Sequence, residues 1–296
     1  MVEKVGKRPN VFLRALLATG RFFKISAENK QALAGMIIMG FFLVMLLVLT
    51  RVFPYDSTPD PYNILARPSG KHLFGTDELG RDLMRRLIAG SRSVLSIAFL
   101  TGLFTVTIGV VLGMVSGLLG GWVDKLIMLV TNLFMTVPTF PIMLVLAQAT
   151  TITDTVLFSF LLSVFSWAGL CRAIRSQIVS VKERDFIQIC KVMNLSKAHI
   201  IFSELFPNIA SYVVVNFIMI MRNAITASVG IMMLGVVAYD HTNWGAVLNS
   251  SQIYIMNPDA LLFWLSPILF IVVFQTGVIL LANGLDVVLN PRLRNN

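Results

Sequence analysis

The chain alternates long apolar stretches with shorter polar segments. Six of the apolar stretches have about the length that a helix needs to cross the hydrocarbon core of a bilayer, which is about 20 residues. They are residues 32–53, 93–118, 126–150, 154–178, 208–236 and 261–286. The pattern therefore predicts an all-α, polytopic membrane protein with six transmembrane helices.

Composition points to the same class. Of the 296 residues, 56% are hydrophobic and 13% are charged, and the mean hydropathy is +0.79; soluble domains carry about 25% charged residues. The first apolar stretch lies between Lys30 and Arg51, with no small-residue cleavage site after it, so we expect an uncleaved helix and not a signal peptide. The net charge of +9 is better explained by basic cytoplasmic loops than by binding of nucleic acid, and we expect no nucleic-acid partner.

Lysine and arginine are distributed unevenly among the polar segments. Most of them lie in residues 1–30, 119–125, 172–207 and 287–296, whereas segments 150–154 and 237–260 contain none. Because basic loops stay on the cytoplasmic side, this asymmetry predicts an N-in, C-in orientation. The basic tail 1–30 forms either a helix on the membrane surface or a flexible tail that only sets the orientation.

The segment between the first two apolar stretches, 54–91, is predicted to lie outside and to contain an amphipathic helix. Thr76 is placed to cap that helix, with leucines on one face and acid–base pairs on the other. The leucines are Leu79, Leu83 and Leu87, and the expected pairs are Asp77 with Arg81 and Asp82 with Arg86. We expect this helix to lie at the membrane interface, where it either anchors the entry of the second span or contacts substrate.

A charged, amphipathic loop at residues 182–207 separates the fourth and fifth apolar stretches. Its first half places Phe186, Ile189, Cys190 and Met193 at helical spacing, which predicts an apolar stripe on a short helix. Asn194 tolerates the left-handed conformation of a helix C-cap. The residue patterns leave two interpretations open, namely docking into the groove of a soluble partner and a hairpin resting on lipid.

The second half of this loop is predicted to form another short helix. Ser196 can cap it, and Ile200, Ile201 and Leu205 give it an apolar side. Pro207 fits a break before the fifth span.

Several stretches of the chain resemble one family. The loop has Gln188-Ile189-Cys190, Asn194 and Phe206-Pro207-Asn208 at the spacing of the coupling loop of membrane subunits in binding-protein-dependent ABC importers, with Gln, Ile, Cys and Asn replacing the usual Glu, Ala, Ala and Gly. Further segments are similar to the C-type permease of dipeptide/oligopeptide importers, in order along the chain. They are residues 74–95, 120–128, 166–187, 243–245 and 283–294.

The resemblance implies an ABC importer type I permease in a prokaryotic plasma membrane. It implies a core of five helices at 92–290 after the first helix at 31–53, and a cytoplasmic C-terminus at 291–296. It also implies a second permease, two ATPase subunits that bind ATP and Mg²⁺, and an external substrate-binding protein. The residues expected to couple to the ATPase are Glu183, Asp185, Phe186, Ile189, Cys190, Met193, Asn194, Ser196, His199 and Phe202.

This chain contains no G-x-x-x-x-G-K-[ST] sequence, so we expect no ATP hydrolysis by the chain itself and no cofactor of its own. Its two cysteines lack metal-ligand spacing and its three histidines are scattered, so we expect neither a metal site nor a catalytic constellation. Short peptides are the expected substrate, with oligosaccharides as the alternative within the family. The alternative from another class is an ATP-independent channel or membrane scaffold.

Polar residues inside the fifth apolar stretch are candidates for the substrate path. Arg222 has 17 uncharged residues on either side, and such a group usually faces protein or water. It either attracts a substrate carboxylate or other polar group, or pairs with an acidic residue of the second permease. Asn216 and Asn223 share one helix face and are path candidates too, although packing between helices explains them equally well.

Overall fold

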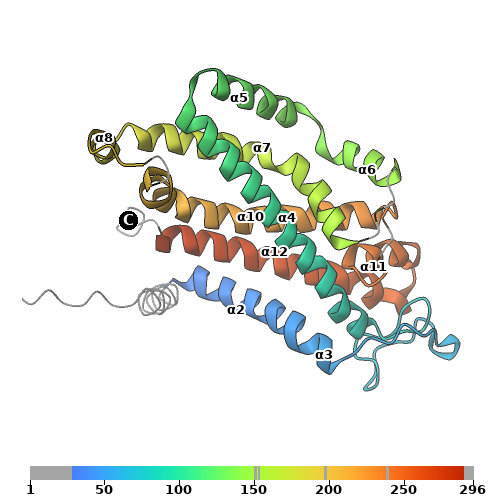
Figure 1. The fold of residues 1–296 in the computed structure, drawn as a ribbon. Helices are drawn as coiled ribbons and strands as arrows, with labels where there is room; N and C mark the ends of the chain where they lie inside the picture. The colour runs from blue at the N-terminus through green and yellow to red at the C-terminus, as the bar shows by residue number, and fades with distance from the viewer. Residues whose placement is uncertain (1–28, 150–151, 153, 197–198, 238–239, 290–296) are drawn as a thin grey trace, which may run out of the picture.

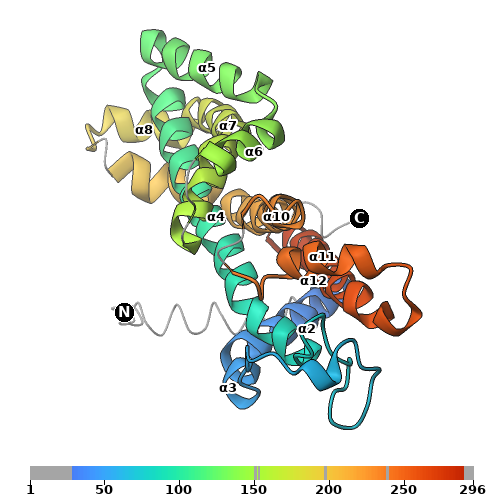
Figure 2. The same ribbon diagram turned by 90° about the vertical axis from the view of Figure 1, so that its right-hand side faces the viewer.

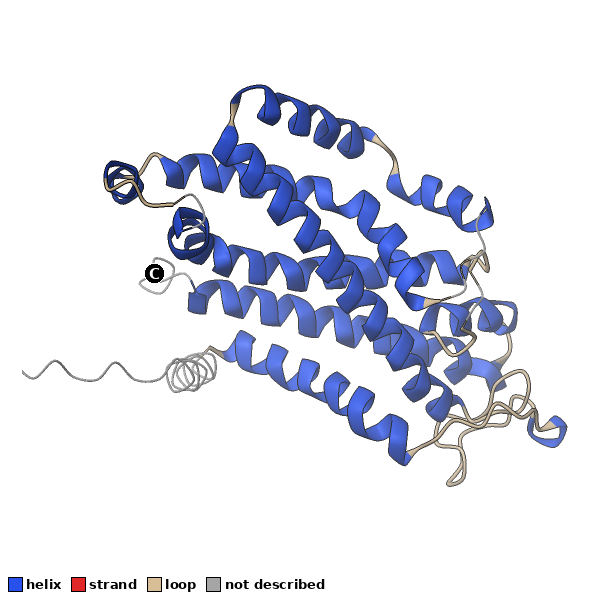
Figure 3. Ribbon diagram, in the orientation of Figure 1, coloured by secondary structure: helices blue, strands red, loops and turns tan. Residues whose placement is uncertain are grey.

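The fold is a bundle of long helices whose two ends carry different structures. The computed structural model describes residues 29–149, 152, 154–196, 199–237 and 240–289, and every regular element within them is helical (Figure 3). The predicted tail 1–30, apart from its last two residues, and the C-terminal segment 291–296 lie outside the described residues. The long helices run roughly side by side in alternating directions (Figure 1).

The elements occur in the following order along the chain. They are α2 (Lys30–Val44), the π-helical turn η1 (Met45–Leu49), α3 (Thr50–Val52), η2 (Pro61–Asn63), α4 (Leu83–Leu119), α5 (Gly121–Thr136), α6 (Thr139–Ala149), α7 (Thr155–Lys182), α8 (Asp185–Val192), the π-helical turn η3 (Ile200–Leu205), α10 (Phe206–Met233), α11 (Trp244–Ser251), η4 (Gln252–Tyr254), η5 (Pro258–Ala260) and α12 (Leu261–Leu289).

Five helical segments are long and apolar enough to cross a membrane. They are Lys30–Val52, Leu83–Leu119, Thr155–Lys182, Ile200–Met233 and Pro258–Val287. The remaining predicted span is broken, because α5 and α6 meet at an angle of 84°. Pro138 lies at this break and Pro141 follows in the first turn of α6, and a proline cannot supply the backbone N–H that a continuous helix requires. Counting that bent pair as one span gives the six spans that the sequence predicts.

We use two names for the ends of the bundle. The α8 end carries α8, η3, the start of α2 and the end of α12, and the α11 end carries α11 and the 54–82 segment (Figures 1 and 2). The structure therefore brings the 182–207 loop to the same end as the first residues of α2 and the last described turn of α12.

Small residues allow the closest helix contacts. Gly113 and Gly117 of α4 face Ile174 and Ile178 of α7, and a Cβ on Gly113 would lie 2.6 Å from the carbonyl oxygen of Cys171. On the other side of the bundle, a Cβ on Gly284 would lie 2.4 Å from the Cα of Ala32. The glycine series that the sequence shows in the second span thus permits close packing of α4 on α7.

The predicted interfacial helix is wrong in its start and its placement, because its second half, 83–91, forms the first turns of α4, in which Leu83 and Leu87 are buried in the core. Thr76 does not cap a helix, because residues 76 and 82 form an isolated β-bridge and α4 begins only at Leu83. Asp82 is the actual N-cap, since its side chain accepts a hydrogen bond of 2.8 Å from the backbone N–H of Arg85. Gly75 and Gly80 both have positive φ angles, which suit a folded loop and not a helical turn.

Candidate functional site: the 182–207 loop and the Arg222 strip

The first predicted coupling helix is present as α8. It begins at Asp185 and ends at Val192, as the helical spacing of its apolar residues predicts. Asn194 follows in the left-handed region with φ of 57°. The N–H of Leu195 donates to the carbonyl oxygen of Cys190 at 3.0 Å, which satisfies a backbone oxygen that the end of the helix would otherwise leave unpaired. Asn194 is therefore a helix-terminating residue.

Ser196 begins the second helical segment of the loop, as the sequence predicts. Its hydroxyl oxygen accepts a hydrogen bond of 3.2 Å from the N–H of His199, and its carbonyl oxygen accepts from the N–H of Ile200. Pro207 lies in the first turn of α10. Both Figures 1 and 2 show the η3 segment running across the direction of α10, so the chain changes direction near Pro207.

Apolar side chains of α8 lie on two sides of the helix. Ile187 and Cys190 are buried, and Phe186 packs against the same cluster of residues from α4, α7 and α10. On the other side, Ile189 and Val192 are 58% and 87% exposed. The prediction of a single stripe is therefore wrong in detail, because Cys190 faces the bundle, while Val192 adds to the exposed side.

Exposed apolar residues continue beyond α8. Met193 is 66% exposed and Phe202 is 72% exposed. Together with Ile189 and Val192 they form what we call the apolar loop surface. The polar coupling candidates of the same loop are also exposed, namely Glu183, Asp185, Asn194, Ser196 and His199.

Three polar contacts join the helix ends near the base of this loop. Lys182 donates from Nζ to the carbonyl oxygen of Gly117 at 2.8 Å. Arg175 of α7 forms an ion pair with Asp124 of α5, with 2.5 Å between Nε and Oδ1, and the hydroxyl of Ser116 donates to the same carboxylate. The ends of α4, α5 and α7 are thus joined where the loop begins.

Arg222 lies on α10 and is half-buried. Its Nε donates to Oε1 of Gln275 on α12 at 2.8 Å, and Nε2 of Gln275 donates to the hydroxyl of Thr226 at 2.7 Å. Gln275 was not a candidate in the sequence, because residues 53 positions apart give no local signal of contact. We call Arg222, Asn223, Thr226 and Gln275 the Arg222 strip.

The two asparagines of α10 have different surroundings. Asn223 is exposed and lines a cavity of 190 Å³ between α6, α7 and α10. Asn216 is half-buried and donates from Nδ2 to the carbonyl oxygen of Tyr212 at 2.9 Å, within its own helix. Asn223 therefore lies beside the cavity next to α6, adjacent to Arg222 along the helix, whereas Asn216 has a local backbone partner.

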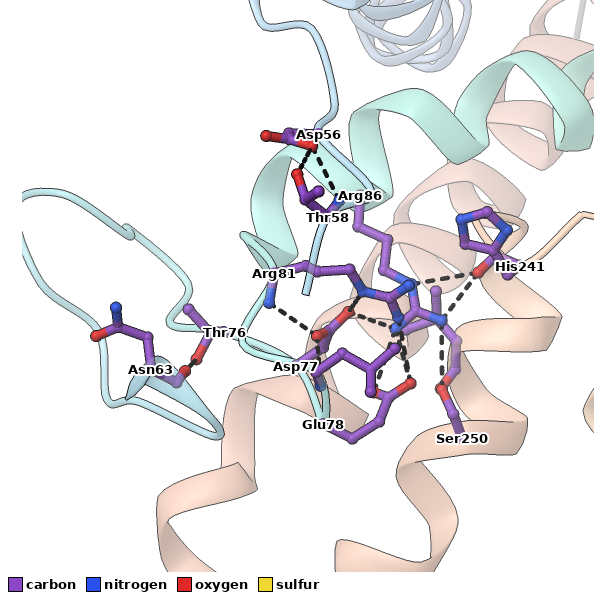
Figure 4. Close-up of polar contacts among 12 residues, drawn as sticks. Asp56, Thr58, Asn63, Thr76, Asp77, Glu78, Arg81, Arg86, His241 and Ser250 are labelled. Atoms are coloured by element: carbon purple, nitrogen blue, oxygen red, sulfur yellow. Dashed lines mark hydrogen bonds and ion pairs between the residues drawn. The ribbon is translucent and has the colours of Figure 1, made fainter. Parts of the chain in front are cut away.

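A buried charge cluster lies at the α11 end (Figure 4). Oδ2 of Asp77 accepts from Nη1 of Arg86 at 2.7 Å and from Nε of Arg81 at 2.8 Å. Nη2 of Arg86 donates to the carbonyl oxygen of His241 at 2.9 Å. The predicted pair of Asp77 with Arg81 is confirmed, whereas Arg86 binds Asp77 and not Asp82.

This cluster joins three parts of the chain. Arg86 belongs to α4, Asp77 to the 54–82 segment, and His241 to the segment before α11. Desolvation by burial raises the pKa of the nearby Tyr55 hydroxyl. Among the described residues, no group of three or more histidine, cysteine or acidic side chains is placed to hold a metal ion.

Comparison with known proteins places the chain in a family. Residues 109–295 match the family described as binding-protein-dependent transport system inner membrane component. The chain is 30% identical over 275 residues to a putative peptide permease protein of Brucella suis, an alignment that covers 91% of this chain and 89% of the relative.

Two further relatives have more specific names. The oligopeptide transport system permease protein OppC of Mycobacterium tuberculosis is 30% identical over 224 residues, covering 75% of this chain and 76% of the relative. The dipeptide transport system permease protein DppC of Alkalihalophilus pseudofirmus is 29% identical over 280 residues, covering 92% and 90%. The chain belongs to the inner membrane components of binding-protein-dependent transport systems and is a multi-pass permease of the prokaryotic inner membrane.

Proposed function

We propose that this chain is one of two permease subunits in an ATP-driven importer of short peptides. Three relatives are named as peptide, oligopeptide and dipeptide permeases, and their names are the support for peptides as the substrate. In this proposal both termini and the α8 end face the cytoplasm, and an external binding protein delivers the peptide to the α11 end.

The apolar loop surface is the observation that carries the coupling role. A helix that only rests on a membrane needs one apolar side. In α8 one apolar side already packs against the bundle through Ile187 and Cys190, and the other side remains exposed through Ile189 and Val192. This exposed side could contact lipid or a protein groove, and membership in a family of ATP-driven transport components favours the groove of an ATPase subunit, where a few apolar anchors on a short helix can dock.

In this mechanism the partner ATPase subunits carry out the ATP chemistry. Two ATPase subunits bind ATP and Mg²⁺, and their closure pushes on α8 and η3. The base of the loop is joined to the spans through Lys182 and the Asp124–Arg175 pair. A displacement of α8 would therefore be passed to α4, α5 and α7.

The test compares two exposed apolar residues at opposite ends of the bundle. Val192 at the α8 end is 87% exposed and Met256 at the α11 end is 93% exposed. Each is changed to aspartate in the full complex reconstituted in liposomes, and ATP-driven uptake of a short peptide and ATPase co-purification are measured. Because a charge in an apolar groove lacks compensation, we expect Val192→Asp to lower uptake at least about tenfold and to weaken ATPase binding.

Met256→Asp serves as the matched control for ATPase binding, which it should leave unchanged. Normal uptake and normal ATPase binding in Val192→Asp would contradict the docking assignment. Uptake of an oligosaccharide and not of peptides by the wild-type complex would contradict the substrate class while leaving the coupling role intact. Uptake that proceeds without ATP would contradict the importer itself.

A further inference from the structure

Arg222 has a hydrogen-bond partner but no counter-charge in the described part of the chain. No ion pair joins it to a carboxylate of the described residues. Its partner on α12 is the neutral amide of Gln275, which is itself held by Thr226. The acidic residues nearest to it along the sequence are Glu204 and Asp240, both far outside the middle of the helix. The positive charge is therefore positioned but not neutralised.

The side of α10 that carries this charge is open. Its other side packs on α4, where Phe217 and Met221 surround Gly102, and Ile225 is part of the central core. Arg222 reaches toward α12, and Asn223 lines the cavity beside α6. Figure 2 shows α10 nearly end-on, between α6 and α12. The Arg222 strip thus lies on a face of α10 flanked by two helices and covered by neither.

The geometry of the guanidinium defines what it can bind. Its Nε is taken by Gln275, which leaves the edge formed by Nη1 and Nη2 for a planar, bidentate acceptor. An arginine in the middle of a span is costly unless it is paired or faces water. A carboxylate fits both demands, since it matches the two donors and neutralises the charge.

We infer that Arg222 binds the terminal carboxylate of the transported peptide as it crosses the membrane. The inference rests on the proposed function and names the group of the substrate that the permease itself recognises. Gln275 and Thr226 are positioning residues, because they hold the Nε edge and turn the other edge of the guanidinium to the open face. A neutral amide in place of a permanent acidic partner leaves the site free for each new substrate.

The experiment uses tetra-alanine with a free carboxylate and the same peptide amidated at its C-terminus. Binding of each peptide to the binding protein is measured separately, and uptake by the reconstituted complex is measured with saturated binding protein. We expect Arg222→Gln to lower uptake of the free acid about tenfold or more while changing uptake of the amide less than about twofold. Arg222→Lys keeps the charge but lacks the bidentate edge, so it should restore only part of the preference for the acid.

Thr276→Val is the matched control on α12. Its hydroxyl donates to the carbonyl oxygen of Val272 in the same helix, so both peptides should be imported at wild-type rates. An equal fall for acid and amide in Arg222→Gln, or no change for either, would overturn the inference. Loss of the second permease from the purified variant would also overturn the inference, because Arg222 would then pair with an acidic residue of that subunit and not with the peptide. If the wild-type complex imports neither peptide, the proposed function fails and the inference fails with it.

Discussion

The two ends of this permease differ in what they bury and what they expose. At the α11 end, Arg86 is 2% exposed and Asp77 is fully buried, and both are satisfied by partners from three segments of the chain. At the α8 end, charged residues surround an apolar surface that no described residue covers. The charge cluster at the first end is thus satisfied within the chain, whereas the apolar loop surface at the second end is free to contact another subunit.

This difference separates stability from coupling. Removing one partner of a buried, hydrogen-bonded ion pair is costly because the other charge stays buried without compensation. Replacing an exposed apolar residue costs the isolated chain little. Changes at the α11 end should therefore affect the folded chain, and changes at the α8 end should affect its assembly and activity.

The largest expected effect on stability is at Asp77. Asp77→Asn removes the fully buried charge that both Arg81 and Arg86 share and leaves Glu78, 3.3 Å from each, as their acidic partner. We therefore expect a destabilisation of about 3 kcal/mol, the low end for a broken buried pair. Thermal unfolding of the purified complex measures it. Asp56→Asn in the same segment is the control, since Asp56 is exposed and its replacement should change stability by less than about 0.5 kcal/mol. Equal melting temperatures for the two variants would show that the cluster is not a stabilising element.

Replacing Asn194 should have a smaller effect on stability, confined to α8. Asn194→Ala places a Cβ-bearing residue without a polar side chain in the left-handed conformation, which costs about 1–2 kcal/mol, whereas Asn194→Gly removes that strain. Hydrogen exchange of residues 185–195 measures the opening of α8. We expect faster exchange in the alanine variant only. Identical exchange in the two variants would rule out the left-handed cap as the residue that fixes the end of α8.

Breaking the exposed ion pair of Arg67 with Asp259 should change stability least. The two side chains are 2.6 Å apart, between Nε and Oδ1, but 77% and 46% exposed. Arg67→Ala should lower stability by no more than about 1 kcal/mol, since solvent screens such pairs. A loss comparable to that of Asp77→Asn would show that exposure does not separate the two kinds of ion pair at this end.

Local signals in the sequence predict most of the helices and their ends. The apolar stretches give the spans, Pro138 and Pro141 mark the broken one, and Asn194 and Ser196 mark the turn of the loop. Each of these features depends on residues within one or two turns of each other. The glycine series of α4 also predicts a close contact, although it does not identify α7 as the neighbour.

Long-range contacts account for what the sequence does not predict. The i, i+4 rule pairs Asp82 with Arg86, but Asp82 caps α4 and pairs with His72, and Arg86 turns to Asp77 and to His241. Helical spacing alone cannot say which side of α8 faces the bundle, so the burial of Cys190 is visible only in the structure. The contact between Arg222 and Gln275 likewise depends on how α10 and α12 pack together.

Docking of the apolar loop surface on an ATPase subunit can be tested by cross-linking. Cys171 and Cys190 are both free and buried, so a cysteine at an exposed position can be modified selectively. In the assembled complex, Val192→Cys labelled with benzophenone maleimide and irradiated is predicted to cross-link to an ATPase subunit, because the photoactivated ketone inserts into nearby C–H bonds and needs no second cysteine. Met256→Cys treated in the same way is predicted not to cross-link to an ATPase subunit. Absence of an ATPase cross-link at position 192, or formation of an ATPase cross-link at position 256, would contradict docking at the α8 end.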